Sequence, residues 1–167
     1  MATVRELLQE LEQEAPATRR VLARVPADRL DWRPHERSMS MGQLANHLAQ
    51  IPRGIISAAL QPSFDPGALP PPQAPASAEA LLATFDDAMT YARATLGRMP
   101  DADLEIPWKV MRGEQLLFTM PRGAVFRTIL LNHSYHHRGQ LTVYLRLNGI
   151  PLPSVYGPSA DEPPFGM

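Results

Sequence analysis

Three of the five histidines lie within one short segment, NHSYHHRGQL, at residues 132–141. Residues four positions apart share one face of a helix, so His133 and His137 point the same way in a helical segment. They occupy positions where a bundle helix normally carries leucine. Burying an imidazole without a partner costs on the order of 1–3 kcal/mol. A metal ion would provide that partner, because neutral imidazole is a common metal ligand.

Another histidine, His47, lies beside the apolar stripe that contains Leu44 and Leu48, so it can face inward toward a second helix. One histidine from this segment and two from residues 132–141 would give three nitrogen ligands. Such a set leaves a coordination position open for water or substrate, as catalytic metal sites do. His136 competes with His137 for the third place, since a spacing of three residues also serves in bundle metal sites. Periodicity does not separate these two.

Taken alone, each of these histidines could also be a core residue that forms a hydrogen bond and binds no metal. The joint occurrence of inward histidines on two segments is what supports the metal hypothesis. His35 falls in a connection and is expected to be solvated. Arg138 lies roughly 100° from His137 around the helix and could bind a carboxylate, an anion or water. Gly139, which costs about 1 kcal/mol in a helix, indicates close packing against another helix or chain.

Composition excludes several classes of protein. Among the 167 residues there is no cysteine, which removes disulfide scaffolds, thiolate metal sites and cysteine nucleophiles. The net charge of -1 and the lack of interleaved basic and aromatic residues argue against nucleic-acid binding. No apolar run reaches the roughly 18 residues of a membrane span, and the charged N-terminus is no secretory signal. We therefore expect a cytoplasmic protein that binds neither nucleic acid nor membrane.

The histidines must be positioned by helices. Apolar periodicity predicts four of them, at residues 2–25, 41–60, 78–98 and 123–148. Ser40 and Gln43 form a capping box at the start of the second helix, and Gly149 ends the fourth. We expect kinks at Pro16 and Pro52. The fold class predicted from these elements is an all-α four-helix bundle, in which any strands would be minor additions.

The connections are also informative. Residues 61–77 include six prolines and are predicted to lack regular structure. Extended at roughly 3.3 Å per residue, this segment reaches about 50 Å, whereas a 20-residue helix is about 30 Å long. It can therefore cross the bundle from end to end and let the third helix run parallel to the second. A short hairpin is predicted around residues 111–114, and residues 151–167 form an irregular tail of a single domain, 1–167.

Three blocks of the sequence, taken together and in this order, resemble a known family. They are WRPHERSMSMGQLANHLA (residues 32–49), NHSYHHRGQL (132–141) and YGPSADE (156–162). This combination is similar to the DinB/YfiT-like family of predicted metalloenzymes, and the similarity covers nearly the whole chain. The resemblance implies an up-down-down-up four-helix bundle and, in many members, a homodimer.

The resemblance also implies a divalent ion, usually nickel or zinc, held by His47, His133 and His137. His136 is then not a ligand. Relatives with known activity include transferases and isomerases that use a low-molecular-weight thiol, bacillithiol or mycothiol, as cosubstrate. The thiol-binding residues of these relatives cannot be matched to positions in this sequence, so the resemblance assigns no substrate.

The function predicted from these features is metal-dependent catalysis. The ion would act as a Lewis acid that lowers the pKa of a bound water or low-molecular-weight thiol, for hydrolysis or S-transfer. No catalytic residue beyond the ligands is assigned, although Gln140 and Asn46 could orient a ligand ring or a bound water. One alternative is a non-enzymatic, stress-associated bundle that binds the metal structurally. Another is an interaction bundle with hydrogen-bonded core histidines and no metal.

Overall fold

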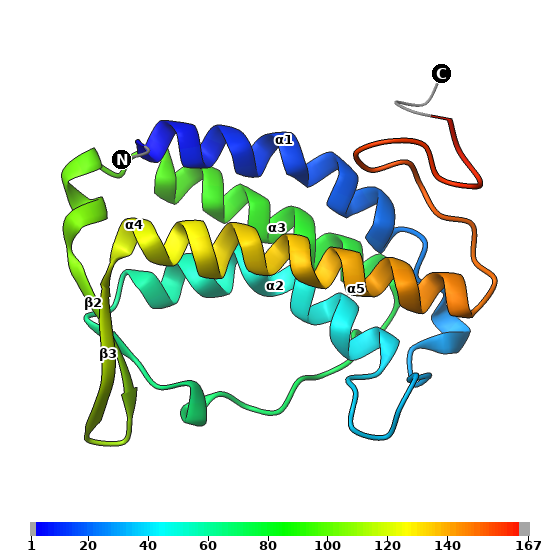
Figure 1. The fold of residues 1–167 in the computed structure, drawn as a ribbon, viewed down its shortest axis with the longest axis horizontal. Helices are drawn as coiled ribbons and strands as arrows, with labels where there is room; N and C mark the ends of the chain where they lie inside the picture. Colours follow the sequence, from blue (N-terminus) through cyan, green and yellow to red (C-terminus); the bar gives the residue numbers. More distant parts are fainter. Residues whose placement is uncertain (1–2, 164–167) are drawn as a thin grey trace.

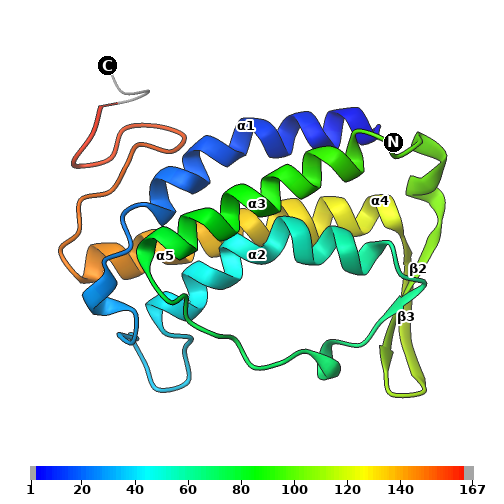
Figure 2. The ribbon, with the colours of Figure 1, turned by 180° about the vertical axis from the view of Figure 1, so that it is seen from behind.

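The computed structural model describes residues 3–163, and over this range the chain is mostly helical (Figure 1). The long helices are α1 (Val4–Leu22), α2 (Met41–Ala59) and α3 (Ala78–Leu96). A fourth helical run is composed of α4 (Arg122–Val125), the π-helical segment η4 (Phe126–Asn132) and α5 (His133–Leu147). These four runs lie side by side, with a hairpin at one end (Figures 1 and 2). The four predicted helices are therefore confirmed to within a few residues at their ends.

The helix ends follow the signals in the sequence. The Ser40 hydroxyl accepts a hydrogen bond from the Gln43 backbone N–H at 3.2 Å, and the Gln43 side chain accepts one from the Ser40 N–H at 2.9 Å. This reciprocal capping box satisfies two backbone donors that the first helical turn leaves free. At the end of α5, Gly149 has a φ of 70°, and the Ile150 N–H donates to the Leu145 carbonyl at 3.1 Å. Glycine adopts this left-handed conformation without a Cβ penalty.

The core lies between the four helical runs. Each run contributes an apolar stripe whose fully buried members are mostly leucines, among them Leu22, Leu44, Leu48, Leu81, Leu96, Leu130, Leu131, Leu141 and Leu145. Both α1 and α2 continue through a proline, Pro16 and Pro52 respectively. The kinks expected at these two prolines stay predictions.

The all-α prediction is wrong in one respect, because the described residues also contain a three-stranded sheet. Its strands are β1 (Ser63–Phe64), β2 (Pro107–Arg112) and β3 (Gln115–Pro121). The predicted hairpin is confirmed as the antiparallel pair β2 and β3, which turns at Gly113 with a φ of 56°. Strand β1 was not predicted, and it pairs parallel with β2. The rings of Phe64 and Trp108 stack at 5.7 Å, and the buried Trp108 indole donates to the Ala58 carbonyl, so packing stabilises this two-residue strand.

The proline-rich crossover, defined as residues 61–77, runs along the bundle from the end of α2 to the start of α3 (Figures 1 and 2). It holds β1 and the short 3₁₀ helix η2 (Pro66–Ala68), so the prediction of no regular structure is wrong for these pieces. Near its end, the Gln43 side chain donates to the Pro72 carbonyl at 3.0 Å, and Asn46 donates to the Gln73 carbonyl at 2.9 Å. Helix α2 thus fastens the crossover through main-chain oxygens.

Residues 23–40 connect α1 to α2, and residues 97–106 connect α3 to β2. Two further 3₁₀ helices, η1 (Ala27–Arg29) and η3 (Asp101–Glu105), follow α1 and precede β2. Residues 151–163 form neither helix nor strand, and residues 164–167 of the predicted tail lie outside the described range. Asp161 pairs with Arg146 of α5 at 2.5 Å, and Glu162 pairs with Arg24 at 2.6 Å, so ion pairs hold this segment against the bundle.

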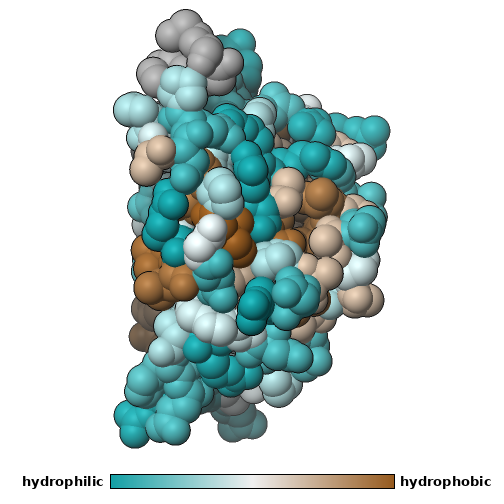
Figure 3. Space-filling view, turned by 90° about the vertical axis from the view of Figure 1, so that its right-hand side faces the viewer, coloured by the Kyte–Doolittle hydropathy of each residue, from teal (hydrophilic) through white to brown (hydrophobic). Residues whose placement is uncertain are grey.

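The end of the molecule at which α5 finishes is mainly hydrophilic, with separate hydrophobic patches among the polar residues (Figure 3). None of the helices within residues 3–163 is long and apolar enough to cross a membrane.

Candidate metal centre

Two helices bring the three predicted histidines together. His47 lies in the middle of α2, and His133 and His137 lie one turn apart at the start of α5. The Nε2 atoms of His47 and His133 are 3.1 Å apart, and one nitrogen from each of the three rings falls within 4.8 Å of the others. The ring centroids of His133 and His137 are 4.4 Å apart, and those of His47 and His137 are 4.7 Å apart.

These distances fit a shared metal ion. Two imidazole nitrogens bound tetrahedrally to one ion at about 2.0–2.1 Å lie about 3.3 Å apart. The 3.1 Å separation of His47 and His133 is close to this value, and the third nitrogen lies within 4.8 Å of both. Within the described part of the chain, these three histidines form the group of side chains that could hold a metal, and the group includes no carboxylate.

Burial keeps the three imidazoles neutral. Loss of hydration, and after it the neighbouring His137 and His47, lower the pKa of His133 from 6.5 to about 4. The pKa of His47 is lowered by burial and then by His137, and the pKa of His137 is also lowered mainly by burial. At neutral pH each ring therefore retains a lone pair for a metal ion, because protonation would cost hydration and bring like charges together.

Gln140 orients one of the rings. Its side-chain Oε1 lies 2.6 Å from Nδ1 of His137. An amide oxygen only accepts hydrogen bonds, so Nδ1 carries the proton and Nε2 presents its lone pair to the cluster. Asn46, the other residue predicted to orient a ligand or a water, instead directs its amide nitrogen to the crossover.

His136 and His137 lie in different surroundings. His137 is 9% exposed and belongs to the cluster, whereas His136 is exposed and lies outside it. The His136 ring meets the edge of His137 at a centroid distance of 5.0 Å. His35 is exposed, as expected, and its ring accepts a hydrogen bond from the Arg37 N–H.

Arg138 anchors α5 on the side away from the cluster. It is 2% exposed, pairs with Glu14 of α1 at 2.6 Å and donates to the Thr18 hydroxyl at 3.1 Å. It also donates to the hydroxyl of Tyr156 in the C-terminal segment. The prediction that Arg138 could bind a carboxylate is confirmed. The close packing predicted at Gly139 is wrong within this chain, because a Cβ there would meet open space.

The π-helical segment η4 is a feature of the site that sequence reasoning missed. It ends at Asn132, directly before the first histidine of the pair. Leu130 and Leu131 are fully buried, whereas Ile129 is only partly buried. Wider π turns change the register of side chains along a helix. Apolar periodicity could not reveal it, because all of Ile129, Leu130 and Leu131 are apolar.

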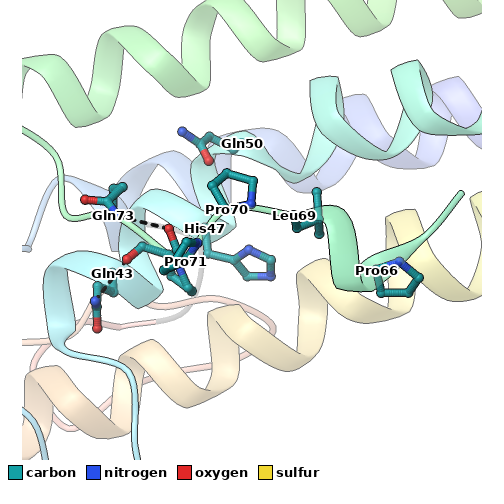
Figure 4. A pocket seen from close by; sticks show the side chains of 9 residues that line it. Gln43, His47, Gln50, Pro66, Leu69, Pro70, Pro71 and Gln73 are labelled. Carbon is teal, nitrogen blue, oxygen red and sulfur yellow. Dashed lines mark hydrogen bonds between the residues drawn. The ribbon is translucent and has the colours of Figure 1, made fainter. Parts of the chain in front are cut away.

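A pocket of about 550 Å³ opens beside the cluster, between α2 and the crossover. His47 forms part of its wall, together with Gln43 and Gln50 from the same helix and residues 66–73 of the crossover (Figure 4). One side of the three-histidine cluster therefore faces a space large enough for a small molecule.

Comparison with known proteins places this chain. The DinB family model matches residues 1–164. The chain belongs to the DinB family. A relative, the uncharacterized protein YrdA of Bacillus subtilis (strain 168), is 30% identical over 162 residues, covering 96% of this chain and 92% of that protein.

Solved DinB structures share the fold. A DinB-like protein from Bacillus cereus ATCC 10987 superposes with a TM-score of 0.71 at 24% identity, over 92% of this chain and 98% of that one. A DinB-like protein from Bacillus subtilis gives a TM-score of 0.67 at 18% identity, over 88% and 94%. The resemblance to the DinB family is thereby confirmed, and the helical fold with its small sheet is a DinB-like fold.

Proposed function

We propose that this DinB protein is a metal-dependent enzyme whose divalent ion is held by His47, His133 and His137. The observation that carries the proposal is the convergence of three neutral imidazoles from two helices, with nitrogens within 4.8 Å, beside an open pocket. Nickel or zinc is the expected ion, since imidazole suits both metals.

The ion, when bound, supplies Lewis-acid activation of a water or a low-molecular-weight thiol for hydrolysis or S-transfer. The chain's own groups prepare this chemistry. Burial keeps the histidines unprotonated, and Gln140 holds the proton of His137 on Nδ1. His47 belongs to both the cluster and the wall of the pocket, which supports the access of a small molecule to the ion from that side.

The up-down-down-up order of helices is part of this proposal. It is supported by the crossover, which spans the bundle and lets α2 and α3 run in the same direction (Figure 1). The cytoplasmic location, the homodimer and the lack of nucleic-acid or membrane partners stay predictions.

Metal analysis of protein purified without a histidine tag tests the ligand set. About one equivalent of nickel or zinc is expected in the unaltered protein and in His136→Ala, with most of it lost in His47→Ala, His133→Ala and His137→Ala. The matched pair is His136→Ala and His137→Ala, adjacent residues of which one is exposed. A full equivalent in both would overturn the assignment.

Activity distinguishes the enzyme from a non-enzymatic metal-binding bundle. Hydrolysis of p-nitrophenyl acetate and conjugation of mycothiol to 1-chloro-2,4-dinitrobenzene would be measured with metal-loaded and metal-free protein. Turnover that requires the metal and is lost in His137→Ala is expected. A tightly held ion that neither exchanges a ligand with added azide nor supports turnover would favour the structural role.

A further inference from the structure

The pocket beside the cluster is built from two walls of different character. On α2 the wall is polar and carries Gln43 and Gln50, one turn before and one turn after His47. On the crossover the wall is mostly apolar, with Leu69 and prolines 70–72, and it ends at the polar Gln73 (Figure 4). None of the side chains that line this pocket is charged.

Charged residues near the pocket are turned to other partners. The Asp65 carboxylate, next to the lining residue Pro66, accepts hydrogen bonds from the Gly67 N–H at 2.8 Å and the Gly113 N–H at 2.7 Å. The Arg53 guanidinium, one turn after Gln50 on α2, lies 4.9 Å from the centre of the Tyr91 ring. The pocket therefore offers no fixed countercharge to a charged ligand.

The three glutamines that line the pocket make different contacts, and Gln73 donates from its amide nitrogen to the Pro71 carbonyl at 3.1 Å. Gln43 uses its oxygen in the capping box and its nitrogen on the crossover, so its amide is part of the wall. Gln50 is exposed, and in the part of the chain that the structure describes its amide makes no hydrogen bond. Gln50 is thus the amide available for hydrogen bonding to a ligand.

The histidine cluster, unlike the pocket wall, favours a charged group on the ligand. Three neutral imidazoles leave both positive charges of a divalent ion uncompensated, and no carboxylate belongs to the described cluster. An anionic donor atom is favoured next to such an ion. Leu69 is 59% exposed, so a charge farther along the ligand would lose only part of its hydration against this wall, but it would gain no partner there.

We propose, building on the metal site proposed above, that the pocket selects small molecules with one ionisable donor atom on an uncharged body. The donor atom meets the metal next to His47. The body lies between Gln50, which hydrogen-bonds to it, and the apolar wall of Leu69 and the prolines.

A matched pair of hydroxamic acids tests this selectivity. Benzohydroxamic acid and 4-carboxybenzohydroxamic acid share one metal-binding head and differ by one charge on the body. Their dissociation constants would be measured from the visible spectrum of the cobalt(II)-loaded protein, with metal content checked after each titration. We expect the uncharged probe to bind about tenfold more tightly or better.

Two variants reverse the preference if the pocket holds the body of the probe. Gln50→Arg on the polar wall and Leu69→Lys on the apolar wall each add a cation, and each is expected to shift the ratio of the two dissociation constants about tenfold toward the carboxylated probe. Gln13→Arg, an added cation on the exposed side of α1, serves as the control and should leave the ratio unchanged.

The outcomes separate the two proposals. Equal binding of both probes by the unaltered protein, or an unchanged ratio in both pocket variants, overturns the selectivity while the bound metal still supports the site. Failure of the protein to retain cobalt overturns the metal site, and the selectivity falls with it.

Discussion

Nδ1 of His137 lies 2.6 Å from Oε1 of Gln140, a residue one turn later on the same helix. The contact fixes the ring of a proposed ligand from within its own helix, without help from a distant segment. The helical repeat places the two residues on one face, so the contact needs only suitable side-chain rotamers within α5.

Replacement of Gln140 by alanine should therefore weaken metal binding without unfolding the protein. Loss of a residue that orients a ligand ring typically costs 10- to 100-fold in affinity. Gln140→Glu keeps an acceptor in place and should retain more of the affinity. Competition titrations against a chelator measure both variants, with circular dichroism as a check on the fold. Equal affinities for Gln140→Ala and the unaltered protein would contradict the orienting role.

The stability of the metal-free protein should fall as the pH decreases from about 6.5 to about 4. His133 has a pKa near 6.5 when unfolded and about 4 when folded, so in this interval the unfolded chain binds more protons. The stabilising contribution is full above pH 6.5 and is lost as the pH falls through 4. Urea unfolding at several pH values would measure the slope. The slope should be smaller in His133→Asn, and an identical slope would show that His133 does not contribute.

Arg138→Ala should destabilise the protein by about 3 kcal/mol, because it leaves the partly buried Glu14 without its cation. A matched control is Arg19→Ala, whose pair with Asp86 joins α1 to α3 with both side chains about half exposed. Such an exposed pair contributes about 1 kcal/mol or less. Urea unfolding of the metal-free variants gives both values, and similar losses would argue that Arg138 is not an anchor.

Two glycines of α2 should respond in opposite directions to alanine. At Gly42 a Cβ would lie 3.0 Å from both the Leu30 carbonyl oxygen and the Ala74 Cβ, so Gly42→Ala should destabilise by about 1–3 kcal/mol. Gly54 faces open space in the helix interior, and Gly54→Ala should stabilise by about 0.5–1 kcal/mol. Thermal unfolding of the two variants measures the difference. A stabilising Gly42→Ala would mean that the crossover does not pack closely on α2.

Much of the fold follows from local signals. The capping box of Ser40 and Gln43 and the left-handed Gly149 are encoded within a few residues, and the structure bears them out. The shared face of His133 and His137 was predictable for the same reason, since a four-residue spacing fixes a helix face. The choice of His137 over His136 needed the packing of α5 against α2, which periodicity does not contain.

The features that escaped prediction depend on contacts between distant residues. Strand β1 has two residues, too few to show alternation, and it exists because Phe64 stacks on Trp108 and pairs with β2. The π turns of η4 are hidden by a run of apolar residues that satisfies several registers. Asn46 binds the crossover because residue 73 comes back to lie against α2. The prolines of the crossover predict an irregular segment but do not say where it meets α2.

The atoms that attach the crossover to α2 differ from the side chains that line the pocket. Gln43 and Asn46 grip peptide oxygens, which every amino acid provides, so the attachment is indifferent to the side chains at positions 72 and 73. Substitutions in the crossover can then change the shape of the pocket while the backbone of the crossover keeps its course. Evolution can therefore change which small molecules the pocket binds through a few substitutions in the crossover, while the helices and the three histidines stay the same.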